Sequence, residues 1–171
     1  MAWLDCFFPQ YRVKSAAAIP YQKLWQDGYR GVIFDIDNTL VEHGAAADEQ
    51  ARQLFDELRS IGLQTMILSN NRRERVASFA LDVSSGYIAK ADKPKVKGYD
   101  EAMAVMATTK ETTFFVGDQL LTDIWGANRA GIRSYLVEPI GKEVEIQIIL
   151  KRWLEKVLWR FHRDDRRTDD G

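Results

Sequence analysis

Hydrophobic and polar residues alternate along most of this chain in blocks whose spacing predicts strands and helices in turn. Short apolar runs typical of buried strands are Val32–Phe34, Leu63–Leu68, Tyr87–Ala89, Thr113–Val116 and Ser134–Val137. Between them, apolar residues recur at helical spacing over 51–61, 76–83, 96–106 and 124–130. Strands alternating with helices predict a Rossmann-like three-layer α/β fold, in which a mostly parallel sheet is covered by helices on both faces.

The same pattern divides the chain into four segments. Residues 1–30 are a lead-in, 31–140 form the α/β core, 141–163 form an amphipathic helix, and 164–171 are a charged tail expected to be disordered. Projection of the helix over 144–161 gathers eight apolar residues on about half of its circumference: Ile146, Ile149, Leu150, Trp153, Leu154, Val157, Leu158 and Phe161. Trp159 falls on the opposite face, beside Arg152 and Glu155.

Two interpretations of this helix remain open. Its apolar face can pack on the sheet or on a second copy of the chain, as amphipathic helices ordinarily do. Alternatively the helix lies in a membrane interface, because six Lys or Arg against three Glu within 142–163 give the apolar face basic flanks. An N-terminal apolar cluster can add to such a surface: Trp3, Leu4, Phe7, Phe8 and Tyr11.

The composition indicates the class of protein, its expected partners and its expected location. The 171 residues suit one domain, and 46% hydrophobic with 29% charged residues is ordinary for a globular protein. A formal net charge of -1 gives no drive toward nucleic acid, so no nucleic-acid partner is expected. Cys6 is the single cysteine, and no signal peptide or run of ~18 apolar residues is present. We therefore expect a cytoplasmic protein, with peripheral attachment to the inner face of the membrane if the terminal helix is interfacial.

Polar residues follow the predicted strands directly, and they come in a definite order: Asp35 and Asp37, then Ser69 and Asn70, then Lys93, then Asp118 and Asp123. In a parallel sheet the carboxyl ends of the strands share one edge, where ligands bind. Two carboxylates held close together repel each other unless a cation offsets them, and Mg²⁺ is the usual one. The order of these residues therefore predicts a shared site.

Each member also has an ordinary explanation. The Asp35–Asp37 pair can be a polar turn after a strand, and Ser69-Asn70 can be a turn or a helix cap. Lys93 can be a solvated surface lysine. Gly117-Asp118 can be a turn, and Asp123 can favour a helix start through the dipole. Their placement at successive strand ends is what favours a common chemistry.

That chemistry is phosphoryl transfer, which needs positive charge and hydrogen-bond donors around the phosphoryl oxygens and a positioned nucleophile. Asp35, at the strand tip, can attack phosphorus and form an acyl phosphate. Asp37 can protonate the leaving oxygen and then deprotonate the attacking water. Ser69 can donate a hydrogen bond to a phosphoryl oxygen.

Four segments resemble the ordered motifs of the haloacid dehalogenase (HAD) superfamily over about residues 30–140: Asp35–Thr39, Ser69–Asn71, Lys93-Pro94 and Gly117–Asp123. The second and fourth resemble more narrowly the YqeG-type HAD-IIIA phosphatases, a group similar to phosphatidylglycerophosphate phosphatases of mitochondria and cyanobacteria. The resemblance implies a hydrolase of phosphate monoesters, with phosphatidylglycerophosphate as the candidate substrate.

The resemblance also implies a role for each residue. Asp35 is the nucleophile, Asp37 is the general acid and base, and Ser69, Asn70 and Lys93 bind the substrate phosphate. Lys93 also orients Asp35, although Lys90, Lys95 and Lys97 are neighbouring candidates for the lysine. The expected cofactor is Mg²⁺, held by three groups with Asp123 as a further ligand or as support: Asp35, the Asp37 carbonyl and Asp118.

The spacing between the motifs limits which parts of the chain can recognise the substrate. About thirty residues separate Asp37 from Ser69 and about two dozen separate Ser69 from Lys93, so neither gap can hold a lid domain. Capless members of the superfamily resemble enzymes for bulky substrates such as proteins, nucleic acids or lipid head groups. A protein, nucleotide or small phosphometabolite substrate stays an alternative, as does, at a lower rank, a non-enzymatic phospho-acceptor or scaffold module. Receiver modules carry the phosphorylated Asp on a later strand, whereas Asp35 follows the first.

Overall fold

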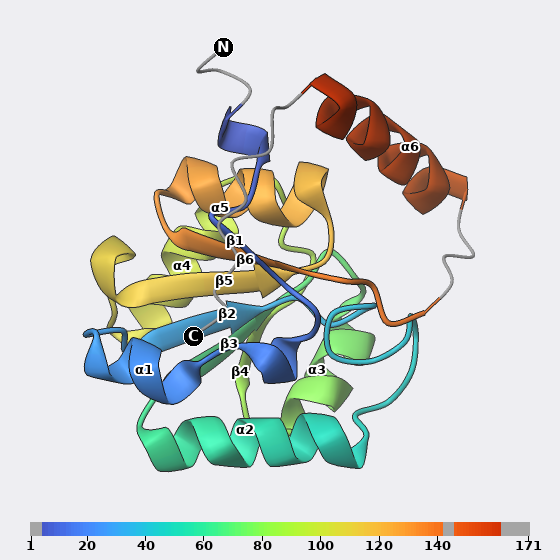
Figure 1. Ribbon diagram of the computed structural model, residues 1–171. Coiled ribbons are helices and arrows are strands. Elements are labelled where there is room, and N and C mark those ends of the chain that lie inside the picture. The colour runs from blue at the N-terminus through green and yellow to red at the C-terminus, as the bar shows by residue number, and fades with distance from the viewer. Residues whose placement is uncertain (1–4, 142–145, 162–171) are drawn as a thin grey trace.

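Six parallel strands form one sheet in the order β1-β6-β5-β2-β3-β4 in the computed structural model, which describes residues 5–141 and 146–161 (Figure 1). The tail predicted for 164–171 lies outside the described residues. The strands are β1 (Tyr11–Val13), β2 (Gly31–Phe34), β3 (Gln64–Leu68), β4 (Gly86–Ile88), β5 (Thr113–Gly117) and β6 (Arg133–Val137). Every neighbouring pair is parallel, which confirms the predicted sheet.

Helices cover both faces of the sheet: α1 (Tyr21–Gln26), α2 (Glu49–Ile61) and α3 (Arg73–Asp82) on one, α4 (Lys97–Met106) and α5 (Trp125–Ala130) on the other. The strand β2 shows why its sequence is apolar throughout. Phe34 lies in the core under α2, with its ring 5.3 Å from that of Phe55. Ile33 points to the opposite face, into the core under α4 and α5. Successive side chains on a strand alternate between faces, so a sheet covered on both sides needs continuous apolar runs.

The strand β1 was not among the five that the sequence pattern predicted. It lies within residues 1–30, the segment assigned to a lead-in. Tyr11 and Val13 pair in register with Tyr135 and Val137 of β6, and the rings of Tyr11 and Tyr135 stack at 5.0 Å. Three residues are too few to show an alternating pattern. Only the pairing with β6 makes this segment a strand.

The connections after β2 and β3 are short, as their lengths predicted. The loop after β2 leads directly into α2, where the carboxylate of Asp48 caps the helix by accepting from the Ala51 amide at 2.8 Å. The segment between β3 and β4 is occupied by α3. No lid domain is inserted at either place.

The terminal helix α6 (Ile146–Phe161) lies beside that edge and contacts the core through an unexpected face. Trp159 packs against Leu120, Ile124 and Leu136, and its ring lies 4.6 Å from that of Phe8. Trp153 and Leu154, on the predicted apolar face, are 60% and 42% exposed. Neither α6 nor any other helix in the described ranges is long and apolar enough to cross a membrane.

The N-terminal aromatic residues also differ from their expected place. Phe8 is buried against Trp159, and the Phe7 ring lies 4.8 Å from that of Trp125. These rings therefore pack on the protein itself instead of extending an interfacial surface. Trp3 and Leu4 lie outside the described residues.

Candidate active site

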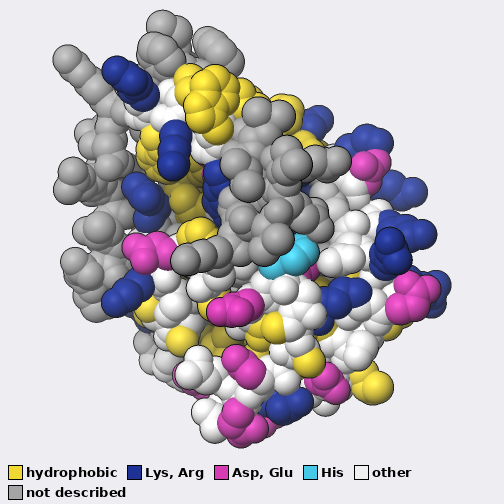
Figure 2. All heavy atoms as spheres, turned by 90° about the vertical axis from the view of Figure 1, so that its right-hand side faces the viewer, with side chains coloured by type: hydrophobic (Ala, Val, Ile, Leu, Met, Phe, Trp, Pro, Cys, Tyr) yellow, Lys and Arg dark blue, Asp and Glu magenta, His cyan; other side chains and the backbone are white. Residues whose placement is uncertain are grey.

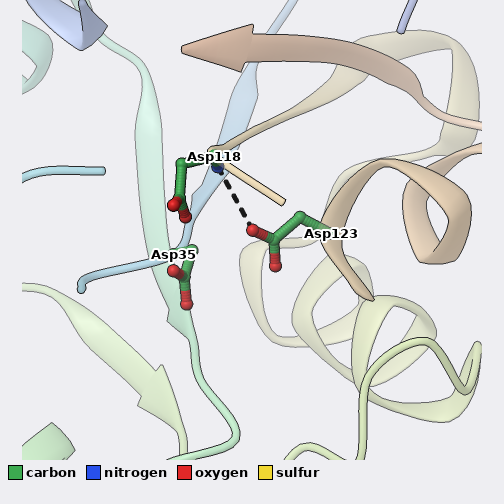
Figure 3. Close-up of side chains that lie close together, drawn as sticks. All are labelled: Asp35, Asp118 and Asp123. Atoms are coloured by element: carbon green, nitrogen blue, oxygen red, sulfur yellow. Dashed lines mark hydrogen bonds between the residues drawn. The ribbon is translucent and has the colours of Figure 1, made fainter. Parts of the chain in front are cut away.

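The predicted site residues meet at the carboxyl edge of the sheet. Asp35 follows β2, Ser69 follows β3, Lys93 lies in the loop after β4, and Asp118 follows β5. Asp123 lies in a π-helical turn, Leu120–Ile124, that precedes α5. The carboxylates of Asp35, Asp118 and Asp123 converge on one space (Figure 3), with one oxygen of each within 4.8 Å of the others.

Lys93 occupies the centre of this cluster. Its Nζ donates to Asp35 Oδ1 at 2.8 Å and to Asp123 Oδ1 at 2.7 Å, and its side chain is 3% exposed. Burial by itself lowers the pKa of Lys93, but the carboxylates of Asp123 and Asp35 outweigh it, so the pKa is raised and the ammonium is retained. The three neighbouring lysines, Lys90, Lys95 and Lys97, are exposed. Lys93 is therefore the lysine that this cluster uses.

The position of Asp123 is fixed by backbone amides. Its Oδ2 accepts from the Asp118 amide at 3.2 Å (Figure 3) and from the Gln119 amide at 3.1 Å. Its Oδ1 accepts from Lys93. Both oxygens of Asp123 therefore accept from protein donors, and both oxygens of Asp118 do so as well, from Thr39 and Arg152, so these contacts do not separate the two as metal ligands. Asp123 can act as support that holds Lys93 and the Asp118 loop together.

Gly117 permits this close approach. A Cβ at Gly117 would lie 2.6 Å from Asp123 Oδ2 and 2.7 Å from its Cβ. We expect Gly117→Ala to displace Asp123 from the Asp118 amide and to destabilise the protein by about 1–3 kcal/mol, as overpacking of a buried site does. Urea unfolding followed by circular dichroism measures this. An unfolding free energy equal to that of the wild type would contradict the packing described here.

The cluster has more negative than positive charge. Three buried carboxylates face the ammonium of Lys93 and the guanidinium of Arg152, which contacts Asp118. Burial, followed by the Asp123 and Asp37 carboxylates, raises the pKa of Asp35 to about 7 despite Lys93. Burial and the carboxylates of Asp123 and Asp35 also raise the pKa of Asp118. Hard oxygen ligands with unbalanced negative charge fit a divalent cation such as Mg²⁺.

Asp37 has a different environment. Its Oδ1 accepts from the Gly44 amide at 2.8 Å and from Arg75 at 3.2 Å, and its Oδ2 accepts from the Asn71 amide group at 3.2 Å. Burial alone would raise the pKa of Asp37, but these three donors more than offset it and lower the pKa. Asp37 is therefore held as a carboxylate, the form that can remove a proton from water.

Ser69 and Asn70 use their side chains differently. The Ser69 side chain is buried, and its Oγ accepts from the backbone N–H of Asn71 at 3.2 Å. The hydroxyl hydrogen of Ser69 can still be donated. The Asn70 amide accepts from the Lys93 backbone N–H at 2.7 Å and donates to the Lys93 carbonyl at 3.1 Å. Asn70 thus positions the loop that carries Lys93. A contact of Asn70 with a substrate phosphate stays a prediction.

Four contributors to the site received no role from the sequence. Thr39 donates to Asp118 Oδ1 at 3.1 Å, and Arg75 pairs with Asp37. From α6, Arg152 donates to the carboxylate and the carbonyl of Asp118, while Glu155 accepts from the Leu120 amide at 2.8 Å. The sequence did place Arg152 and Glu155 together with Trp159 on one helix face. It gave no sign that this face meets the loop after β5.

Comparisons with known proteins agree with the fold and the motifs. Residues 91–143 match the family model described as HAD-hydrolase-like. The chain is 38% identical over 136 residues to "Probable phosphatase YqeG" of Bacillus subtilis (strain 168), which covers 79% of each protein. It is 25% identical over 170 residues to "Phosphatidylglycerophosphate phosphatase 1, chloroplastic/mitochondrial" of Arabidopsis thaliana, covering 88% of this chain and 49% of the relative.

Solved structures support the fold. The crystal structure of a HAD-superfamily hydrolase from Ehrlichia chaffeensis aligns with a TM-score of 0.53 at 16% identity, covering 75% of this chain and 97% of that one. The all-parallel sheet covered by helices on both faces and the aspartate–lysine cluster at its carboxyl edge place the protein among three-layer, Rossmann-like hydrolases of the HAD type. The similarity to the Bacillus phosphatase makes the assignment specific: this chain belongs to the HAD-like phosphatase family.

Proposed function

We propose that this phosphatase is Mg²⁺-dependent and hydrolyses phosphate monoesters through an aspartyl-phosphate intermediate, an acyl phosphate formed on Asp35. The observation that carries the proposal is the contact of Lys93 with both Asp35 and Asp123, at 2.8 and 2.7 Å, beside the converging carboxylate of Asp118. Mg²⁺ held by Asp35, the Asp37 carbonyl and Asp118 would supply positive charge to the phosphoryl oxygens. Lys93 would orient Asp35 and supply further positive charge.

The protein's own groups complete the reaction. A carboxylate oxygen of Asp35 attacks phosphorus, the ester P–O bond breaks, and the leaving oxygen takes a proton from Asp37. Water then attacks phosphorus, Asp37 removes its proton, and the bond between phosphorus and the Asp35 oxygen breaks to release phosphate. Asp37 is a carboxylate before substrate binds, and as the anionic phosphate approaches, Asp37 takes up a proton from solvent, which it then gives to the leaving oxygen. Ser69 donates to a phosphoryl oxygen.

Phosphatidylglycerophosphate is the proposed substrate. The Arabidopsis relative, a protein named phosphatidylglycerophosphate phosphatase 1 that is 25% identical to this chain, supports it. The connections after β2 and β3 also support it, because they carry no lid domain that would exclude a large substrate. Proteins, nucleotides and small phosphometabolites are the competing substrate classes.

We expect activity to disappear on treatment with EDTA and to return on addition of Mg²⁺. Release of inorganic phosphate should be measured with four substrates: phosphatidylglycerophosphate in mixed micelles, a nucleoside monophosphate, a phosphopeptide and glycerol 3-phosphate. The lipid should give the highest kcat/KM. Activity that survives the chelator would contradict the metal requirement, and a higher kcat/KM for one of the other three would contradict the lipid substrate.

A further inference from the structure

The helix α6 contacts the rest of the protein through its less apolar face. Glu155 is 4% exposed and accepts from the Leu120 amide, Arg152 donates to Asp118, and Trp159 packs on Leu136 and its neighbours. Trp153 and Leu154 are instead 60% and 42% exposed. The amphipathic helix thus buries its more polar side and leaves tryptophan and leucine exposed, an arrangement that a second surface can cover.

Helix geometry places the two faces opposite each other. At about 100° per residue, Arg152, Glu155 and Trp159 are centred on one side, and Trp153, Leu154 and Val157 on the other. The apolar side therefore points away from the sheet. No rearrangement within α6 can bury Trp153 on the core while Glu155 and Arg152 keep their contacts with the loop after β5.

The charges on α6 are arranged for an anionic surface. Over 151–160, the one acidic residue, Glu155, is buried against backbone amides. The remaining charges that reach solvent are cations. Lys156 and Arg160 flank one edge of the apolar side, and Lys151, which is half-buried, flanks the other edge. Cations beside exposed Trp and Leu are typical of helices that lie in the interface of an anionic membrane.

This surface lies on the same side of the molecule as the active site. In Figure 1 the strand arrows point toward the side of the molecule where α6 lies. Figure 2 shows that side, with hydrophobic side chains in its upper part and Lys and Arg side chains around them. Ile140, which follows β6, is 47% exposed there, and its amide donates to the Asn38 carbonyl at 3.0 Å. A surface that engages α6 would therefore also face the carboxyl edge of the sheet.

We propose that Trp153 and Leu154, with Lys156 and Arg160 beside them, form a docking surface for an anionic lipid bilayer. Trp153 and Leu154 enter the interface, and the two cations remain at the level of the lipid phosphates. Arg152 and Glu155 tie α6 to the Asp118 loop, so docking brings the catalytic edge to the membrane. The role of the docking surface rests on the phospholipid substrate of the proposed function, but the binding of the protein to vesicles can be measured without turnover.

Co-sedimentation of the full chain with vesicles tests this surface. We expect binding to phosphatidylcholine vesicles that contain phosphatidylglycerol and much weaker binding to pure phosphatidylcholine. The double variant Trp153→Gln/Leu154→Gln should bind the anionic vesicles more weakly by a factor of at least about ten. Lys156→Gln/Arg160→Gln should bind about 25-fold more weakly, since each cation near an anionic surface contributes about fivefold.

The matched control is Leu81→Gln/Val105→Gln, which removes two exposed apolar residues, 80% and 66% exposed, from α3 and α4. This variant should bind vesicles like the wild type. Equal binding by the Trp153/Leu154 variant and the wild type, or no binding by the wild type, would overturn the proposal. So would light scattering that shows a wild-type dimer and a monomeric Trp153/Leu154 variant, because that result assigns the surface to a second copy.

Hydrolysis of p-nitrophenyl phosphate separates this proposal from the proposed function. The Trp153/Leu154 variant should keep wild-type activity on this soluble ester, because neither residue contacts the site. A wild type that hydrolyses the ester but does not bind anionic vesicles would refute the docking surface alone. A wild type that binds vesicles but releases no phosphate from any ester would support the docking surface and refute the proposed reaction.

Discussion

Asp35→Asn is expected to reduce phosphatase activity by at least about 10³-fold, the scale seen when a nucleophile is removed. The Asn side chain has the same shape as that of Asp35 but cannot form the acyl phosphate, and it weakens the binding of Mg²⁺. Phosphate release at saturating Mg²⁺ and substrate measures the effect. Turnover close to that of the wild type would contradict the assignment of Asp35 as the nucleophile.

The same variant should not be less stable without metal. The wild-type cluster sets three carboxylates, Asp35, Asp118 and Asp123, against the cations of Lys93 and Arg152. Removal of one buried negative charge lessens the repulsion among the three carboxylates, and Asp123 still pairs with Lys93, so the melting temperature measured in EDTA should equal or exceed that of the wild type. Added Mg²⁺ should raise the melting temperature of the wild type more than that of the variant. Asp27→Asn, at an exposed ion pair with Lys23, is the control.

Lys93→Met is expected to cost both activity and stability. The Met side chain fills a similar volume, but Asp35 and Asp123 lose the ammonium that lies within 2.8 Å of both. Breaking a buried ion pair from one side costs about 3–5 kcal/mol, because the remaining charges are left uncompensated. Urea unfolding in EDTA measures the loss, and Mg²⁺ should restore part of it by replacing the missing positive charge. Activity should fall because Asp35 is no longer oriented.

Lys95→Met provides the matched control two residues away. Lys95 pairs with Asp92 at the surface, where both side chains are more than half exposed. Its replacement should change the free energy of unfolding by no more than about 0.5 kcal/mol and leave activity unchanged. If Lys93→Met behaved like Lys95→Met, the central position of Lys93 in the site would be contradicted.

Local patterns determined much of the fold. The apolar run at β2 is continuous because both faces of that strand are buried, and the alternation with α2, α3 and α4 predicts a parallel sheet. Parallel strands bring their carboxyl ends together, so residues as far apart as Asp35 and Asp123 could be assigned to one site. The structure brings them together around Lys93. Their catalytic roles remain predictions.

The sequence by itself determined the layered fold, the succession of strands β2 to β6 along the chain and the set of acids, hydroxyl and lysine that follow them, because each depends on residues close together along the chain. Tertiary structure alone decided that β1 joins the sheet, that Arg75 holds Asp37 and that Arg152 reaches Asp118. These contacts join residues 38 and 34 positions apart in the last two cases. Tertiary structure also decided which face of α6 is buried. A helical pattern shows that two faces differ, but the packing partner determines which one is covered, and here the loop after β5 offers backbone amides and a carboxylate that Glu155 and Arg152 satisfy.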